Sequence, residues 1–137
     1  MLFSIQIQYI CTLLQVFDMK TSLRFYCETL RFTIHQFAGE KDDIGWVWLK
    51  WGSNDLMLNT AYETPKRPAK PDAARVAAHA DTSIYFGCDN IDGVYQDLLS
   101  KGMEPAPPTV APYGMKQLYF QDPDGYQLCF QWETVVD

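Results

Sequence analysis

The chain has 137 residues, a formal net charge of −6 and a sequence pI of about 4.7. This length fits one domain with its own core, and the acidic balance argues against a nucleic-acid partner, which would require a clustered basic face. The four cysteines, Cys11, Cys27, Cys88 and Cys129, are scattered along the chain, so we expect reduced thiols and a cytoplasmic protein rather than a disulfide framework.

The first half of the chain predicts one strand, one helix and three further strands. Residues 5–17 are rich in Ile, Tyr, Thr and Val. They lack the basic start and the small-residue cleavage site of a signal peptide, so we expect a strand and no membrane segment. A helix follows over residues 19–29, capped by Asp18. Strands over residues 32–37, 45–51 and 55–60 complete the order βαβββ.

The same order returns after a solvated linker over residues 61–80, which is rich in proline, lysine and arginine. We expect a strand over residues 82–88 and a helix over residues 91–100, with Asn90 as N-cap and Gly102 beyond its end. The helical periodicity predicts five buried side chains: Ile91, Val94, Tyr95, Leu98 and Leu99. A short edge strand in the proline-rich stretch 104–114 and a hairpin over residues 115–132 complete this half.

A tight turn at Asp122, Pro123, Asp124 and Gly125 sets the register of that hairpin. Asp accepts backbone hydrogen bonds at the first position, Pro presets φ at the second, and Gly takes the left-handed conformation. Because side chains alternate along a strand, one side of the second strand is apolar and the other is polar. The apolar side carries Tyr126, Leu128, Phe130 and Trp132, and the polar side carries Gln127, Cys129 and Gln131.

The two halves indicate an internal duplication. The helix caps Asp18 and Asn90 are 72 residues apart, and the same offset carries residues 56–58 (Leu-Met-Leu) onto residues 128–130 (Leu-Cys-Phe). The helix ends, Arg31 and Gly102, need a gap of one residue. We therefore expect one domain over residues 1–137 with two modules, 5–60 and 81–133, that pair within the chain or between chains to close a cleft.

With these features the chain resembles the vicinal oxygen chelate superfamily of glyoxalases, bleomycin resistance proteins and extradiol dioxygenases. The resemblance rests on Asp18, Ser22, Phe25 and Tyr26, on Leu30-Arg31-Phe32 where relatives usually have Leu-Gly-Phe, on the helix cap at residues 89–92, and on Tyr113-Gly114 leading to the turn at residues 122–125. It implies an α+β fold in which two βαβββ modules form a curved mixed sheet around a cleft. In character the chain is closest to the metal-free bleomycin resistance-like members.

The resemblance also implies where a metal-dependent relative would hold its divalent cation. One ligand comes from the first strand of each module, seven residues before the helix cap, and one from the last strand. In this sequence those positions are Cys11, Met57, Ser83 and Cys129. Cations such as Mg²⁺, Mn²⁺ and Fe²⁺ prefer carboxylate or imidazole ligands, so we expect no metal of the usual kind.

Other uses of the cysteines and histidines remain open. Cys11 and Cys129 with Met57 could hold a soft ion, or a cysteine could act as a nucleophile, but the favoured interpretation is that the thiols fill an inward-facing slot. His35 and His79 fall on no ligand position, and we expect ordinary hydrogen-bonded roles for both. A shifted strand register could still place one of them in the site.

Alternation of side chains predicts which residues line the cleft. The predicted lining from the first and last strands of the two modules is Tyr9, Cys11, Asp55, Met57, Asn59, Ser83, Tyr85, Gln127, Cys129 and Gln131. Trp46 and Trp48 join this set if their face of the strand at residues 45–51 is the cleft face. The alternative is that these indoles belong to the core or to a dimer contact. Tyr113 either closes over the cleft or braces its own loop.

Aromatic rings, amides and carboxylates without a cation favour a protein that sequesters a planar or cationic small molecule. The resemblance implies a homodimer, and no cofactor is expected. The alternative is an enzyme: a glyoxalase- or dioxygenase-like lyase or oxygenase whose divalent-metal ligands lie at shifted positions, or a metal-free isomerase with Asp55 or Asp81 as its base.

Overall fold

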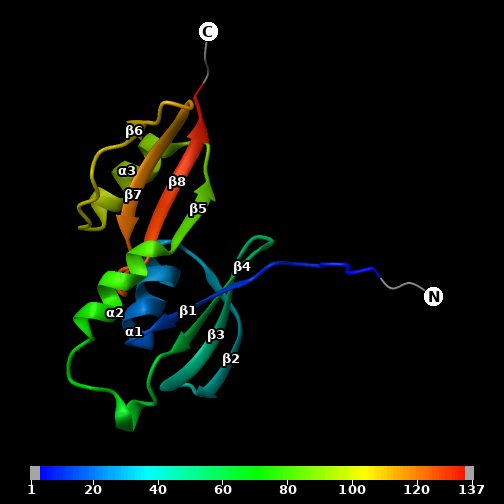
Figure 1. Cartoon of the computed structure of the whole chain (residues 1–137), viewed down its shortest axis with the longest axis vertical. Helices are drawn as coiled ribbons and strands as arrows, with labels where there is room; N and C mark the ends of the chain where they lie inside the picture. The colour runs from blue at the N-terminus through cyan, green and yellow to red at the C-terminus, as the bar shows by residue number, and fades with distance from the viewer. Residues whose placement is uncertain (1–3, 135–137) are drawn as a thin grey trace. The chain divides into compact units, whose positions relative to one another are not determined.

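The computed structural model describes residues 4–134 and divides the chain into two compact units, residues 1–68 and 69–137 (Figure 1). The boundary between them falls inside the segment that the sequence predicts as a linker. Each unit is built around its own four-stranded mixed sheet. The two sheets with their helices confirm the predicted α+β fold of two modules.

The first unit contains β1 (Thr12–Val16), α1 (Met19–Leu23), a π-helix (Arg24–Thr29), β2 (Thr33–Glu40), β3 (Asp43–Trp51), β4 (Asn54–Thr60) and a 3₁₀ turn (Thr64–Lys66). The strands lie in the order β1-β4-β3-β2. β1 runs parallel to β4, and the other neighbours are antiparallel. The helix starts where predicted, because the Asp18 carboxylate accepts hydrogen bonds from the backbone N–H groups of Lys20 and Thr21.

The second unit contains α2 (Ala73–Ala78), a 3₁₀ turn (His79–Asp81), β5 (Ser83–Gly87), α3 (Ile91–Ser100), β6 (Thr109–Val110), β7 (Met115–Gln121) and β8 (Gln127–Glu133). Its strand order is β5-β8-β7-β6, with β5 parallel to β8. The proline-rich stretch therefore holds only the two-residue strand β6, as expected. Within the described residues, no helix is long and apolar enough to cross a membrane.

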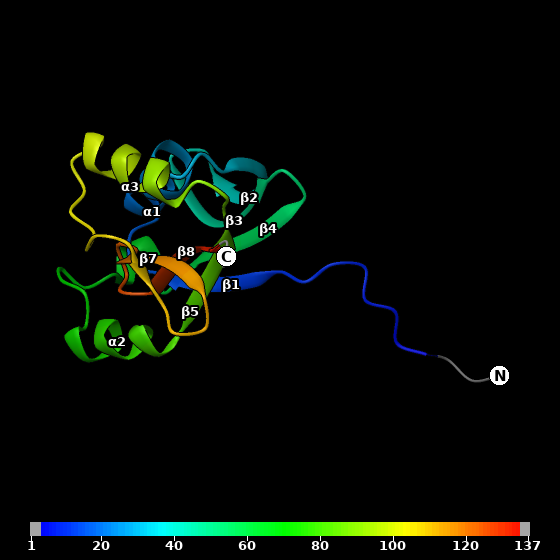
Figure 2. The ribbon, with the colours of Figure 1, turned by 90° about the horizontal axis from the view of Figure 1, so that it is seen from above.

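Each sheet buries one face against its own helix. In the first unit α1 packs on β3 and β4, and the buried side chains are Leu14, Val16, Met19, Phe25, Tyr26, Phe32, Val47, Leu49, Leu56 and Leu58. In the second unit α3 packs on β7 and β8 (Figure 2), and the buried apolar set includes Ile91, Leu98, Leu118, Phe120 and Leu128. The opposite face of the first sheet is the one that α1 does not cover.

Strand register confirms the duplication. In the first unit Leu13 pairs with Met57, and in the second unit Tyr85 pairs with Cys129. Both residues of the second pair lie 72 positions after those of the first. The two parallel strand pairs are therefore superimposable in register, as the offset between the helix caps predicts.

The one-residue gap at the helix ends has a structural cause. The second turn of the first helix is a π-helix, in which the N–H of Leu30 bonds to the carbonyl of Phe25 five residues earlier. A π turn accommodates one extra residue compared with an α turn. The two helices then end alike, because Arg31 with φ 68° occupies the same left-handed position as Gly102 with φ 82°.

The hairpin turn in the second unit forms as predicted. Oδ1 of the buried Asp122 accepts hydrogen bonds from the backbone N–H groups of Asp124 at 2.8 Å and Tyr126 at 3.0 Å. Gly125 has φ 86°, and a Cβ there would lie 2.7 Å from the carbonyl oxygen of Val76. Glycine is required here by conformation and by space.

Three expectations about strands and burial are wrong. The predicted strand over residues 5–17 begins only at Thr12, and residues 4–11 lead away from the sheet without a strand partner (Figures 1 and 2). β-propensity alone does not make a strand without a neighbour to pair with. Leu99, expected to be buried, and Trp132, expected on the apolar core side of its strand, are 39% and 49% exposed because they lie near the ends of α3 and β8. Residues 1–3 of the apolar opening lie outside the described residues.

Candidate functional site

The sequence-predicted residues of the first unit lie together on the face of its sheet opposite the core. We call this surface the tryptophan face; it comprises Tyr9, Cys11, His35, Trp46, Trp48, Lys50, Asp55, Met57 and Asn59. Trp46 lies opposite Asn59, and Trp48 opposite Met57, across the β3–β4 pair. Alternation along β3 buries Val47 and Leu49 on the other side. The face carrying both indoles is therefore the one without the helix.

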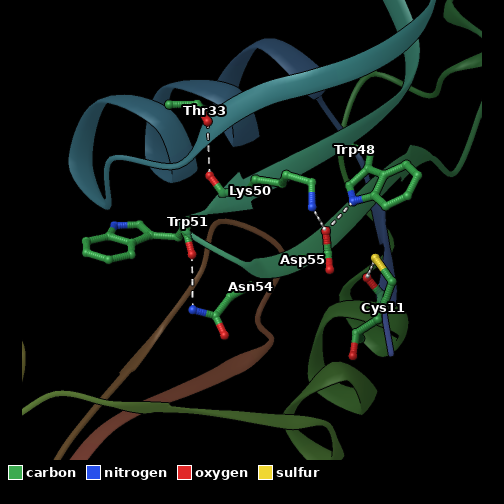
Figure 3. Close-up of polar contacts among 8 residues, drawn as sticks. Cys11, Thr33, Trp48, Lys50, Trp51, Asn54 and Asp55 are labelled. Carbon is green, nitrogen blue, oxygen red and sulfur yellow. Dashed lines mark hydrogen bonds and ion pairs between the residues drawn. The ribbon is translucent and has the colours of Figure 1, made fainter. Parts of the chain in front are cut away.

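A polar cluster anchors the tryptophan face (Figure 3). Oδ1 of Asp55 accepts a hydrogen bond from the Trp48 indole Nε1 at 2.8 Å and lies 2.9 Å from Nζ of Lys50. The Lys50 ammonium also lies 5.6 Å from the Trp48 ring centroid, within cation–π distance. The bond from Lys50, and then that from Trp48, hold the pKa of Asp55 below its usual value. Asp55 is therefore ionised near neutral pH.

His35 reaches the same face through a β-bulge. The register of β2 on β3 pairs Ile34 with Leu49 and Gln36 with Trp48, which leaves His35 as the extra residue. A bulge breaks strict alternation and re-aims side chains. The His35 ring meets the Trp48 indole edge-on, with centroids 5.0 Å apart. Alternation within a strand contains no signal for this placement, so His35 is not among the residues that the sequence predicts for the site.

Lys50 was also absent from the predicted cleft residues. Its position follows from β3 once the face of Trp46 and Trp48 is known, because residues two apart on a strand share a side. The sequence did not decide which face that was. Tyr9, which precedes β1, lies beside Trp48, with its ring centroid 5.4 Å from that of Trp48.

The surroundings of the two cysteines on the predicted lining disfavour their thiolate forms. Burial, and then the nearby Asp55 charge, raise the pKa of Cys11. Cys129 is fully buried, and burial raises its pKa as well. All four cysteines carry free thiols. Because the thiolate is the reactive form, covalent chemistry at Cys11 or Cys129 is disfavoured near neutral pH.

The open face of the second sheet carries hydroxyl and amide pairs. The Ser83 hydroxyl donates to the Gln127 side chain at 2.9 Å, and the hydroxyls of Tyr85 and Tyr119 lie 3.2 Å apart. A second group joins three side chains: Nε2 of Gln117 donates to the Tyr113 hydroxyl at 2.8 Å and to Gln131 Oε1 at 3.1 Å. Tyr113 thus braces its own loop.

Tyr119 and His79 complete the second unit's polar contacts. The hydrogen bond with Tyr85 raises the pKa of Tyr119, so this hydroxyl stays protonated. His79 lies away from the predicted lining: its Nδ1 is 2.7 Å from the Asp124 carbonyl oxygen, and its ring stacks on Tyr126 at 4.0 Å. His79 therefore ties the 3₁₀ turn to the hairpin.

The four positions implied for a divalent cation do not offer the donors that hard cations require. The first unit contributes Cys11 and Met57, and the second contributes Ser83 and Cys129; none is an imidazole or a carboxylate, the ligands preferred by Mg²⁺, Mn²⁺ and Fe²⁺. Across residues 4–134, no three His, Cys, Asp or Glu side chains gather closely enough to hold an ion. The expected absence of a metal stays a prediction.

The sequence matches the family model described as the glyoxalase/bleomycin resistance protein/dioxygenase superfamily over residues 6–130. The chain belongs to this superfamily. A comparison with curated proteins gives no match.

Solved structures share the superfamily fold along nearly the whole chain. A glyoxalase/bleomycin resistance protein/dioxygenase from Nocardioides has a TM-score of 0.70 at 20% identity, covering 98% of this chain and 89% of its own. TnmS3, an antibiotic binding protein from Streptomyces sp. CB03234, has a TM-score of 0.69 at 19% identity, with coverages of 96% and 100%. A glyoxalase family protein from Enterococcus faecalis reaches 0.66 at 26% identity, with coverages of 93% and 97%.

Proposed function

We propose that this member of the superfamily binds a planar organic compound on the tryptophan face and does so without a divalent cation. The observation that carries the proposal is the grouping of rings around Trp48. Tyr9 and His35 both contact the Trp48 ring, at 5.4 and 5.0 Å between centroids, and Trp46 follows on the same side of β3. Aromatic walls with a few fixed polar groups are typical of small-molecule sites.

Among the similar structures, the antibiotic binding protein TnmS3 shows that this fold is compatible with a binding role. Its likeness at 19% identity concerns the fold alone, so the ligand must be inferred from this chain's own residues. Those residues offer stacking surfaces, one ionised carboxylate and its ammonium partner. They favour reversible capture, because neither cysteine on the predicted lining carries a lowered pKa.

The test uses three probes that share one ring system: 2-naphthamidine, 2-naphthamide and 2-naphthoate. We expect at least one to bind in calorimetry, and Trp48→Leu to weaken that binding by about ten-fold because ring contacts are lost. Trp51→Leu is the matched control, since Trp51 lies on the same strand but on the opposite side. If no probe binds, or if both variants behave alike, the tryptophan face is not the site.

Metal analysis of protein purified without chelator tests the second part of the proposal. We expect less than a stoichiometric amount of any divalent ion, and probe binding that EDTA does not change. A stoichiometric ion would overturn the metal-free mode of binding.

A metal-dependent lyase or oxygenase is the second candidate, and one observation favours it. The bulge brings His35 to the same face as Asp55. A metal-dependent enzyme would require ligands at such shifted positions, because the four implied positions carry neither imidazole nor carboxylate. Its signature would be a stoichiometric ion that is lost in His35→Ala. A metal-free isomerase is less well supported, because the lowered pKa of Asp55 makes this carboxylate a weaker base.

We further propose a cytoplasmic homodimer. Four free thiols fit a reducing compartment, and the segment before β1 exposes Ile5, Ile7 and Ile10 at 92%, 70% and 80%, an apolar surface that association would cover. Light scattering on the purified protein at several concentrations measures the mass directly. A monomer at all concentrations would overturn the dimer.

A further inference from the structure

The Asp55 carboxylate uses only one of its two oxygens within the described residues. Both of its hydrogen-bond donors, Trp48 Nε1 and Lys50 Nζ, bond to Oδ1. Figure 3 shows these two bonds converging on one oxygen, with the other oxygen pointing away from both donors. No donor among the described residues is seen to bond to Oδ2. The side chain is only 6% exposed, and Oδ2 keeps contact with solvent, since no buried side-chain oxygen of the described residues lacks a partner.

The two donors also fix the direction in which the second oxygen points. Trp48 is held by its ring contacts with Tyr9 and His35, and Lys50 is directly opposite Asp55 in the β3–β4 register. A carboxylate held by two donors from one side cannot rotate without breaking one of them. Oδ2 is therefore a preorganised acceptor beside an aromatic surface, which lowers the cost of ordering when a ligand binds.

The charges around Oδ2 disfavour an acid. Lys50 balances the charge of Asp55, but its ammonium bonds to Oδ1, so the atom presented to a ligand is a carboxylate oxygen. Such an atom accepts hydrogen bonds and cannot donate one. An anionic ligand would place like charge beside it, and the chain's net charge of −6 adds to that penalty.

We propose that Asp55 determines the specificity of the tryptophan face: the ligand is a planar aromatic compound bearing an N–H donor, such as an amidine, amine or amide, that bonds to Oδ2. This inference rests on the proposed function, since it assigns the ligand class of the same site. Charge-assisted hydrogen bonds to a carboxylate are among the stronger ones. The amidine is therefore the tightest of the three naphthyl probes, the neutral amide follows, and the carboxylate is the weakest.

The decisive experiment is Asp55→Asn with all three probes. Trp48 and Lys50 both donate, so they orient the new amide with its oxygen toward them. This places the amide N–H₂ where Oδ2 was, and an acceptor becomes a donor. We expect 2-naphthamidine to lose about ten-fold in affinity, the scale of a hydrogen bond to a charged group, while 2-naphthoate binds more tightly than to the unmodified chain.

The matched control is Asp42→Asn, which changes net charge equally in the exposed turn before β3 and is expected to leave the order of affinities unchanged. Lys50→Met is a second variant that keeps the carboxylate. It removes the balancing charge, so it should weaken 2-naphthoate and retain 2-naphthamidine. Circular dichroism verifies that each variant is folded.

The outcomes separate this inference from the proposed function. If the probes bind in a Trp48-dependent way but 2-naphthoate equals 2-naphthamidine, or Asp55→Asn leaves their order unchanged, the role of Asp55 is wrong and the site stands. If Trp48→Leu has no effect on any probe, the site itself is wrong. An inverted order in Asp55→Asn with an unchanged order in Asp42→Asn supports both.

Discussion

The indole nitrogen of Trp48 lies 2.8 Å from Oδ1 of Asp55, although each residue faces a different neighbour across the β3–β4 pair, Met57 and Lys50 respectively. The bond is thus a diagonal one, between residues that the register does not place opposite each other. It joins the indole ring that would stack on a ligand to the carboxylate that would select the ligand. A substitution of Trp48 should therefore change the pKa of Asp55.

Replacing Trp48 by Phe keeps a ring on the face and removes the N–H donor. We expect the pKa of Asp55 to rise toward its ordinary value of 3.8, because a hydrogen bond to the ionised form is lost. An NMR titration of the Asp55 carboxyl carbon measures this shift. Trp46→Phe is the control, since Trp46 faces Asn59; an equal rise in that variant would mean that the indole bond does not set the pKa.

Asp55 should also make stability depend on pH in the acid range. Its pKa is lower in the folded chain than the ordinary 3.8, so its stabilising contribution is complete above that value and is lost as the pH falls through the folded pKa. Asp55→Asn should therefore reduce the decline in unfolding free energy between about pH 4 and pH 2. Urea unfolding at a series of pH values tests this, and an unchanged decline would contradict it.

Arg31 is expected to cost stability at the end of the first helix. Its φ of 68° is in the left-handed region, which disfavours a side chain with a Cβ. We expect Arg31→Gly to stabilise the fold by about 0.5–1 kcal/mol, the strain relieved less the added entropy of the unfolded chain. Thermal and urea unfolding measure the change. Arg31→Ala keeps the Cβ and should gain nothing; an equal gain would point to the lost charge.

Asp122 should be needed for the hairpin turn through its acceptor oxygen rather than its charge. Asp122→Ala removes the acceptor of the N–H groups of Asp124 and Tyr126, and we expect a loss of about 2–3 kcal/mol for the two buried hydrogen bonds lost. Asp122→Asn keeps an acceptor oxygen and should lose less than half as much. Urea unfolding of both variants decides the question, and equal losses would show that the charge matters more.

Much of the fold could be predicted because its determinants are local. Asp18 and Asn90 cap helices that begin as expected, and the turn at residues 122–125 fixes a hairpin in the predicted register. The superfamily and the duplicated order follow from the same residues. Whether the predicted lining residues bind a ligand stays a prediction, although those of the first unit do share one face of its sheet.

The remaining features depend on contacts between segments that are distant in sequence. The bulge at His35 arises from how β2 pairs with β3, so alternation within β2 could not place that ring beside Trp48. The late start of β1 is similar. Residues 5–11 have the composition of a strand, but β1 pairs with β4 only from Thr12 onward. The π-helix corresponds to one feature of the sequence: the gap of one residue in the alignment of the two halves at the helix ends.

The two halves share the same strand order, but different side chains line the open faces of their sheets. Lys50 and Asp55 lie on the first, whereas the second presents paired hydroxyls and amides from Ser83, Gln127 and the two tyrosines Tyr85 and Tyr119. Dissolved salt screens attraction between charges and leaves neutral hydrogen bonds nearly untouched. Sodium chloride therefore distinguishes the two open faces: a ligand affinity that falls as ionic strength rises indicates binding beside Lys50 and Asp55, and one that does not change indicates the neutral hydroxyl and amide pairs of the second sheet.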